Sequence, residues 1–288
     1  MRLAMWRRDG QDLLGVVEPD GWYELESGPD QPQSVQQIVS DLDYWEPRVR
    51  EQIASLTKNP GEPPYAWLPP IGNPSKILCV GLNYADHAKE TGASVPDRPV
   101  IFNKLATTLS AQGRPIVLPP ESSKVDYEAE LVVVIGKQGR RIAEADAMSH
   151  VAGYACGNDV SARDWQKETP GGQWLLGKSF DTFAPLGPYV VTADAIPDPG
   201  KLKIQFRLDG ETLQESSTDQ LLFSIPRVIS YISQVCTLLP GDLIYTGTPA
   251  GVGVARTPRR YLQPGQIAEV EIEGLGVLRN PVVADGEG

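Results

Sequence analysis

The fold of this chain is decided by residues 124–136, KVDYEAELVVVIG. The second half of this stretch is apolar and β-branched and ends at Gly136, which predicts a buried strand. In the first half, Asp126, Glu128 and Glu130 occupy alternate positions, and alternate side chains of a strand face the same way. A rise of about 3.3 Å per residue puts the Cα atoms of Glu128 and Glu130 roughly 6.6 Å apart. Two carboxylates at that spacing can converge on one cation.

Two interpretations of this acidic pair are open at this point. In one, Glu128 and Glu130 form a solvated, acidic strand end. In the other, they hold a hard cation such as Mg²⁺, which prefers carboxylate oxygen. Without a cation, buried carboxylates this close repel each other, and one of them has to hold a proton.

The composition is that of a globular protein with a sizeable core. The chain has 288 residues and a formal net charge of −11. This charge argues against a nucleic-acid partner, which needs a basic surface. It leaves an anionic substrate open, because a bound divalent ion can reverse the local field.

Cysteine usage and hydropathy bear on location. Cys79, Cys156 and Cys236 lie far apart in the sequence, which is typical of free thiols in a reducing compartment. The N-terminus has no apolar core of a signal peptide, and no apolar run approaches the roughly 20 residues of a membrane span. These features predict a cytoplasmic protein with no membrane partner.

Three segments are predicted along the chain: a small N-terminal α+β domain over residues 1–58, a proline-rich linker over 59–75 and a larger domain over 76–288. The helical pattern of residues 35–56 belongs to the first segment. The linker is expected to lie across the surface of the domain that follows it through Tyr65 and Trp67.

The third segment has short strands at regular spacing and few helices, which predicts a mainly β fold. Asp209-Gly210 is a hairpin turn. Residues 224–237 form the clearest helix, with Ser224 as its N-cap. Its expected apolar stripe consists of Val228, Ile229, Ile232, Val235 and Cys236.

Several residues outside the acidic pair are candidates for chemistry. His87 and Glu90 are three apart on a helical run, so the carboxylate can orient the imidazole, although a surface helix is the alternative. The polar segment 91–99 suits a mobile lid. Asp159 follows a strand and can supply a third ligand.

Four further features carry weaker signals. Arg163 can bind an anion or pair with Asp164, and Lys178 can enter a cavity or lie in solvent. His150 has no acid or base partner nearby in the sequence and is interpreted as structural. The glycine-rich segment 247–253 lacks the lysine of a phosphate-binding loop, but its amides and Thr248 can hold a small carboxylate.

Five motifs taken together resemble the fumarylacetoacetate hydrolase family. They are GLNYADH (81–87), DYEAEL (126–131), NDVSARD (158–164), GKSF (177–180) and TGTPAGVG (246–253). The resemblance covers about residues 76–283. The run GGQWLLGKSFDTF (171–183) is similar to the branch of fumarylacetoacetate hydrolase domain-containing proteins, which includes mitochondrial relatives.

The resemblance implies a mixed β-sandwich roll, a homodimer, and bound Mg²⁺ or Mn²⁺. It implies that Glu128, Glu130 and Asp159 are the metal ligands, and it does not make Asp126 a ligand. It also implies a catalytic group formed by His87, Glu90 and Lys178. Positions near the substrate are Lys104, Arg163, Gln166 and Thr248.

The resemblance leaves the reaction open among several classes. The first hypothesis is a Mg²⁺-dependent hydrolase that cleaves a C–C bond in 2,4-dioxo acids of the acylpyruvate or fumarylpyruvate type. The second is an oxaloacetate tautomerase or decarboxylase, which shares the enolate but uses no attacking water. The third is a catalytically silent, metal-binding protein. The first two expect a small 2-oxo acid as the substrate.

Overall fold

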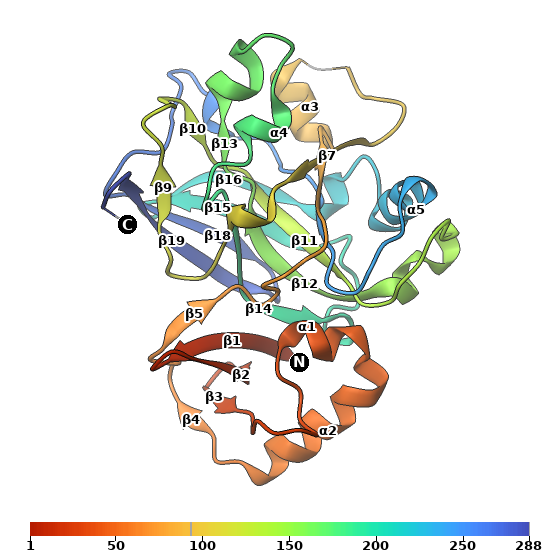
Figure 1. Ribbon diagram of the computed structural model, residues 1–288. Helices are drawn as coiled ribbons and strands as arrows, with labels where there is room; N and C mark the ends of the chain where they lie inside the picture. The colour runs from red at the N-terminus through yellow and green to blue at the C-terminus, as the bar shows by residue number, and fades with distance from the viewer. Residues whose placement is uncertain (93, 288) are drawn as a thin grey trace.

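Two β-sheets enclose the main core of the protein in a computed structural model that describes residues 1–92 and 94–287 (Figure 1). The larger sheet contains, in order, β4 (Asn59–Pro60), β3 (Gly21–Glu24), β2 (Gln11–Glu18), β1 (Arg2–Arg8), β14 (Ala184–Thr192), β12 (Val151–Asn158), β11 (Ala129–Ile135), β17 (Leu243–Tyr245), β6 (Ile77–Gly81) and β7 (Val100–Lys104), with β5 (Ala66–Leu68) against β1 and β8 (Leu109–Ser110) against β14. The smaller sheet contains β16 (Glu211–Ser217), β15 (Lys203–Leu208), β18 (Ile267–Ile272), β19 (Gly276–Ala284) and β9 (Ile116–Leu118), and a separate pair is formed by β10 (Val125–Asp126) and β13 (Ser161–Ala162). The predicted mainly β sandwich is confirmed.

Short helices cover the ends and edges of these sheets. The α-helices are α1 (Val35–Ser40), α2 (Leu42–Ser55), α3 (Ala85–Thr91), α4 (Trp174–Gly177) and α5 (Ile225–Val235). Short 3₁₀ helices are η1 (Ala106–Thr108), η2 (Glu144–His150), η4 (Ala193–Ala195), η5 (Thr218–Gln220) and η6 (Gly253–Ala255), and η3 (Asp164–Glu168) is a π-helix. Figure 1 places α3 and α4 together at the end opposite to α1 and α2. Within the described ranges, no helix has the length and hydropathy needed to cross a membrane.

Strand β11 is buried on both faces, which explains its uninterrupted apolar sequence. Leu131 and Val133 face the core between the two sheets, where Phe206 of the smaller sheet also lies. Val132 and Val134 face a second core, which α1 covers with Ile38. Glu128 and Glu130 precede these residues on the face of Val132, so both acids lie on one side of the strand, as their spacing predicts.

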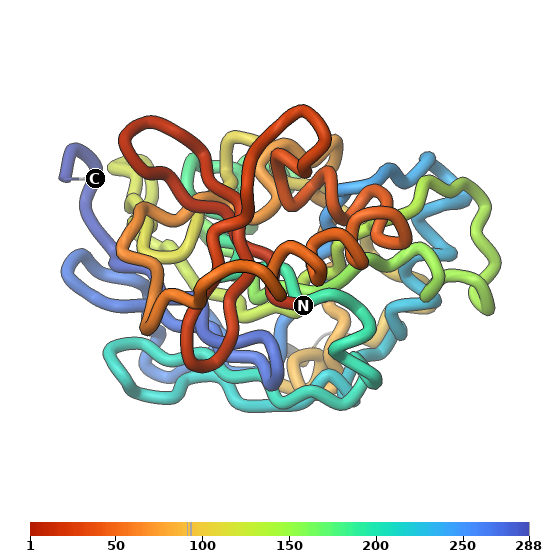
Figure 2. The backbone as a smooth tube through the Cα atoms, turned by 90° about the horizontal axis from the view of Figure 1, so that it is seen from below, coloured from red at the N-terminus to blue at the C-terminus, as the bar shows by residue number. Residues whose placement is uncertain are grey.

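The N-terminal strands continue the larger sheet, because β1 pairs with β14 through Arg2 opposite Val191 and Leu3 opposite Val190. Viewed from below, this segment lies across the rest of the chain (Figure 2). The single helix predicted over 35–56 is two helices. Asp41 leaves helical geometry (φ −154°, ψ 70°) and caps α2 by accepting from Tyr44 N. The domain boundaries at 58 and 75 stay predictions.

The proline-rich segment packs differently from the prediction. The Tyr65 ring lies edge-on to Trp22 at 5.6 Å, and Trp67 lies edge-on to Trp6 at 5.7 Å. Both partners belong to the N-terminal strands, so this segment contacts the first unit through these rings. Strand pairing of β5 with β1 explains the difference, because it places the two aromatic faces together.

Helix α5 and the hairpin follow the prediction with one exception. Ser224 caps α5 through Arg227 N, and Asp209-Gly210 joins β15 to β16. Val228, Ile229 and Ile232 are buried, but Val235 is 79% exposed. Val235 is the last residue of the helix, where the chain turns to an extended Cys236.

A substitution at Gly157 can test how tightly the strands around the acidic pair are packed. It lies opposite Glu130, and a Cβ there would be 2.5 Å from Val132 Cγ2 and 2.6 Å from Tyr245 Cε1. We expect Gly157→Ala to lower the free energy of unfolding by about 1–3 kcal/mol, because it overpacks a rigid core.

Gly72→Ala is the matched control, because nothing lies within 4 Å of its added Cβ. It should change stability by less than about 0.5 kcal/mol. Urea unfolding of the two variants measures the difference, and equal stability of both would contradict this account of the packing.

Candidate metal centre and active site

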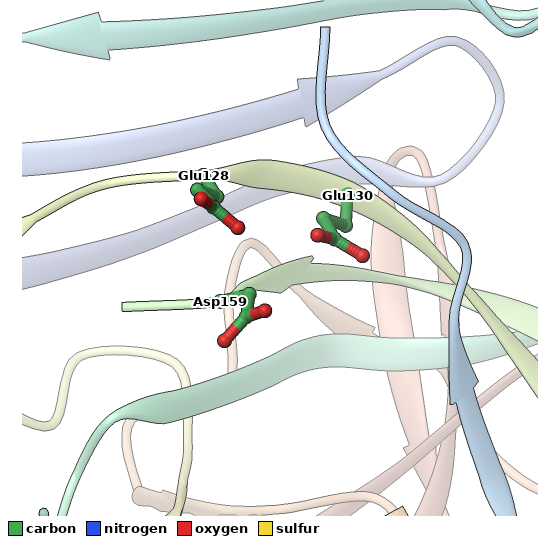
Figure 3. Close-up of side chains that lie close together, drawn as sticks. All are labelled: Glu128, Glu130 and Asp159. Carbon is green, nitrogen blue, oxygen red and sulfur yellow. The ribbon is translucent and has the colours of Figure 1, made fainter. Parts of the chain in front are cut away.

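Three buried carboxylates converge in the part of the chain that the structure describes. Glu128, Glu130 and Asp159 each offer an oxygen, and these oxygens lie within 4.8 Å of one another. Figure 3 shows the two glutamates pointing from one strand toward Asp159, which lies at the end of the neighbouring strand. Their exposed fractions are 7%, 1% and 0%, so the solvated strand end is ruled out.

Pairing of β11 with β12 brings the third carboxylate to the first two. Ala129 lies opposite Asn158, so the residue after Asn158 reaches the level of Glu128. Asp159 N donates to Glu128 O at 2.9 Å, and Glu128 N donates to Asn158 Oδ1 at 3.0 Å. These two hydrogen bonds fix the backbone of both segments that carry the carboxylates.

Three cations surround two of the three carboxylates. Lys178 Nζ lies 2.8 Å from Glu128 Oε2 and 2.6 Å from Asp159 Oδ2. Lys104 Nζ donates to Asp159 Oδ1 at 2.6 Å, and Arg163 Nη2 lies 2.7 Å from Glu128 Oε1. The Arg163 contact is an ion pair without hydrogen-bond alignment.

Glu130 has no salt bridge with any described residue. Its Oε2 accepts from Gly247 N at 2.7 Å. Burial, with Asp159 and Glu128 beside it, raises the pKa of Glu130 well above its usual value. Burial alone would also raise the pKa of Glu128, but Lys178 and Arg163 lower it.

These features fit a divalent metal ion. The donors are hard carboxylate oxygens, which suit Mg²⁺ or Mn²⁺ better than soft metals. A buried carboxylate without a cation is costly, and a metal ion would compensate Glu130. The three residues could therefore hold a metal, as expected for this triad.

Asp126 has a structural role next to this centre. Its Oδ1 accepts from Tyr127 N and Gly253 N, and its Oδ2 accepts from Val254 N at 3.0 Å and from Arg163 Nε at 2.8 Å. The carboxylate thus joins the strand β10 to the glycine-rich loop and orients Arg163. Asp164, proposed above as a possible partner of Arg163, instead accepts from Ser122 and Ser123.

Helix α3 carries His87 over the cavity. His87 Nδ1 lies 3.2 Å from Glu90 Oε2, and Glu90 Oε1 accepts from Gly251 N at 2.9 Å. Asp86 Oδ2 accepts from Ser216 Oγ at 2.6 Å, which ties the same helix to β16. The predicted lid segment 91–99 follows this helix; residue 93 lies outside the described residues, and the mobility of the lid stays a prediction.

One cavity of about 260 Å³ brings these groups together. It is lined by seven of the residues that the sequence predicts for the site: His87, Glu128, Glu130, Arg163, Gln166, Lys178 and Thr248. The remaining lining residues were not predicted: Val80, Gly81, Leu82, Phe102, Lys167 and Trp174. Phe102 and Trp174 pack edge-on at 5.3 Å and form an apolar wall.

Trp174 enters this wall because Gly81 leaves room for it; a Cβ on Gly81 would be 2.8 Å from the Trp174 ring. Trp174 lies next to Gly81 in space but far from it in sequence. No local sequence pattern could therefore indicate that the two residues are neighbours. Lys167 lies beside Gln166, and burial and Arg163 lower its pKa.

Other predicted residues lie further from the cavity. Lys104 is not one of the lining residues, and its Nζ also donates to Val160 O at 3.1 Å. Burial lowers its pKa, against the effect of Asp159. His150 is outside the site, with Nδ1 2.9 Å from Lys137 O. The catalytic and substrate-binding roles of the predicted residues remain predictions.

Comparisons with known proteins bear on this arrangement. Residues 76–283 match the family model described as fumarylacetoacetate (FAA) hydrolase C-terminal. The chain is 45% identical to mitochondrial oxaloacetate tautomerase FAHD2A of Bos taurus over 94% of its own length and 87% of the relative. The Homo sapiens protein of that name is 51% identical over 75% of this chain and 69% of the relative.

Solved structures agree with the fold along the whole chain. A putative HpcE protein from Mycobacterium smegmatis superimposes with a TM-score of 0.87 at 37% identity, covering 99% of this chain and 100% of the other. Maleylpyruvate hydrolase from Sphingobium sp. SYK-6, in complex with manganese(II) ion and pyruvate, superimposes with a TM-score of 0.82 at 30% identity, with 99% of each chain covered.

The predicted cytoplasmic location is contradicted by these comparisons. Relatives from Bos taurus, Xenopus laevis and Homo sapiens, 45–52% identical to this chain, are named as mitochondrial proteins. Free cysteines separate oxidising from reducing compartments and do not distinguish between two compartments in which thiols stay reduced.

The buried carboxylate triad and the sandwich around it thus occur in a chain that matches the family model over 76–283. The protein belongs to the fumarylacetoacetate hydrolase family and is an enzyme of that family.

Proposed function

We propose that this enzyme catalyses keto–enol tautomerisation of a small 2-oxo dicarboxylic acid, with oxaloacetate as the substrate. The observation that carries the proposal is one cavity lined by Glu128 and Glu130 of the acidic triad, His87 and Lys178, with Asp159 directly behind Lys178. The names of relatives at 45–52% identity, oxaloacetate tautomerases, support the same reaction.

We propose Mg²⁺ as the ion, with Mn²⁺ as a substitute, held by Glu128, Glu130 and Asp159. When bound, the ion would hold the substrate's 2-oxo acid group and stabilise the negative charge that develops on enolisation. Arg163 and Lys178 lie at the same end of the cavity and offset the negative charge of Glu128 and Asp159. With a divalent ion added to them, the local field would favour a dianionic substrate despite the acidic net charge of the chain.

His87 is proposed to move the proton at C3. Because its Nδ1 is bonded to Glu90, proton transfer would use Nε2. Glu90 fixes the ring orientation, and Gly251 N–H fixes Glu90 in turn. Phe102 and Trp174 exclude water on one side of the cavity, which suits a reaction with no attacking water.

Cleavage of a C–C bond in 2,4-dioxo acids, the first hypothesis from the sequence, becomes the second candidate. It is supported by the likeness to maleylpyruvate hydrolase, at 30–31% identity. The tautomerase relatives are 45–52% identical, so they support the alternative hypothesis better. Both reactions share the enolate and the same triad.

One assay series separates the two reactions. Purified enzyme with Mg²⁺ is given oxaloacetate, and the decay of enol absorbance is followed. The same enzyme is then given a panel of acylpyruvates, and pyruvate release is followed by NMR. Faster enol–keto exchange without pyruvate release supports the tautomerase; pyruvate release without enhanced exchange would replace it with the hydrolase.

Glu130→Gln tests the metal centre. We expect Mg²⁺ binding, measured by titration calorimetry, to weaken beyond detection, because the ion loses one of three anionic ligands. In excess chelator the variant should be at least as stable as the wild type, because it lacks a buried carboxylate that has no salt bridge.

Asp146→Asn is the control, because Asp146 is exposed and outside the triad. It should bind Mg²⁺ like the wild type. Normal Mg²⁺ affinity of Glu130→Gln, or full wild-type activity in chelator, would contradict the assignment.

His87→Ala tests the proton transfer. The rate of enol–keto exchange should fall by about 10²–10⁴-fold, the usual contribution of a general acid–base group. The other histidine of the chain supplies the control: His150→Ala should leave the rate unchanged, because His150 contacts Lys137 O outside the cavity. A His87→Ala rate within about threefold of wild type would exclude this role.

We also propose that the enzyme is a homodimer, as the family resemblance implies. Leu105, Leu175 and Leu176 are 46%, 38% and 46% exposed, and Leu105 N donates to Ser179 Oγ just after α4. These neighbouring apolar side chains are suited to contact with a second copy. Sedimentation should give about twice 31.3 kDa at micromolar concentration; a monomer would refute the proposal.

A further inference from the structure

Two side chains hold the residue that separates Glu128 from Glu130. Ala129 N donates to Gln214 Oε1 at 2.9 Å, and Ala129 O accepts from Thr248 Oγ1 at 2.9 Å. Gln214 comes from β16 of the smaller sheet and is 1% exposed. On this side of β11, the two side chains therefore take the place of a neighbouring strand at the level of the triad.

Backbone groups determine the direction of every hydrogen bond in this network. Ala129 N–H can only donate, so the Gln214 atom facing it is the amide oxygen. The amide nitrogen then faces Pro249 O at 2.8 Å and Thr248 Oγ1 at 2.8 Å. Because the nitrogen is a donor, the Thr248 oxygen must accept from it.

The hydroxyl of Thr248 consequently has one hydrogen-bonding position left. Its single proton goes to Ala129 O, which can only accept, and one lone pair is taken by Gln214. The remaining position is a lone pair. Thr248 lines the cavity that holds the triad, and it keeps 5% of its surface exposed.

We infer that Thr248 is a specificity-determining residue that offers the ligand only a hydrogen-bond acceptor, and that Gln214 is the positioning residue that fixes this polarity. A ligand hydroxyl satisfies the lone pair, whereas an oxo or carboxylate oxygen at the same place is repelled. The cavity thereby distinguishes the enol or 2-hydroxy form of a small acid from its 2-oxo form.

This polarity reverses the sequence-based expectation for Thr248. The hydroxyl was expected to help hold a carboxylate, which requires a donor. The sequence could not indicate otherwise, because Gln214 and Ala129 become neighbours of Thr248 only in the folded chain. The inference rests on the proposed function for the class of ligand, a small 2-oxo acid and its enol.

The test is a binding cycle that needs no turnover. Tartronate carries a hydroxyl between two carboxylates, and malonate is the same ion without it. Their dissociation constants are measured by calorimetry, in saturating Mg²⁺, for wild type, Thr248→Val and Thr248→Ser. The preference for tartronate over malonate is then compared among the three proteins.

We expect Thr248→Val to reduce that preference by about 3- to 10-fold, the contribution of one hydrogen bond, whereas Thr248→Ser keeps it. Gln214→Met should also reduce it, because the Thr248 hydroxyl loses the partner that fixes its lone pair. Val is nearly isosteric with Thr, and Ser keeps the hydroxyl oxygen. A general loss of packing would weaken tartronate and malonate alike and would therefore leave the preference unchanged.

An unchanged preference in Thr248→Val, with both ligands weakened equally, would show a purely structural role and overturn the inference. A preference that rises in Thr248→Val would overturn it as well. Failure of the tautomerase assay with an intact tartronate preference would refute the proposed reaction and leave this inference standing. If Gln214→Met does not fold, the Val and Ser pair still decides the outcome.

Discussion

The site depends on the antiparallel pairing of β11 with β12. This register places Asp159 at the level of Glu128 and Glu130 and buries all three carboxylates at one end of the sheet. Burial of each ion costs several kcal/mol unless it is compensated. Lys178, Lys104 and Arg163 compensate two of the acids, and Glu130 has no salt bridge with any residue that the structure describes. The strand register that builds the sheet thus also brings the charged side chains together.

The glycine-rich loop connects the carboxylate triad with helix α3. Gly247 N–H binds Glu130, Gly251 N–H binds Glu90, and Gly253 N–H binds Asp126. A side chain at Gly253 would be 1.9 Å from Arg260 O, so the loop can approach these carboxylates only with glycine there. Backbone amides of one loop therefore set the relative position of Glu130 next to β11, of helix α3 and of Asp126, which orients Arg163.

The smaller sheet contributes to the site without lining the cavity. Gln214 reaches from β16 to Ala129 and Thr248, and Ser216 on the same strand holds Asp86 of α3. Tyr127 stacks on Phe206 of β15 at 4.1 Å, which fixes the segment just before β11 against this sheet. The sandwich thus supports the acids from the side opposite to β12.

The sequence by itself determined the strand over 129–135, the candidate triad, the helix that carries His87 and the family. Alternation and short motifs are local properties, and the chain can express them without its tertiary neighbours. The family motifs also indicated the alternative reaction that the relatives support.

Only the tertiary structure decided which partners these residues have. It assigned Arg163 to Asp126 and Glu128, put Tyr65 on Trp22, and left Val235 in solvent. It also determined that the Thr248 hydroxyl accepts a hydrogen bond from Gln214, which is 34 residues away in sequence. Long-range hydrogen bonds and charge compensation arise from strand pairing between distant segments, and a linear pattern carries no information about which distant groups meet.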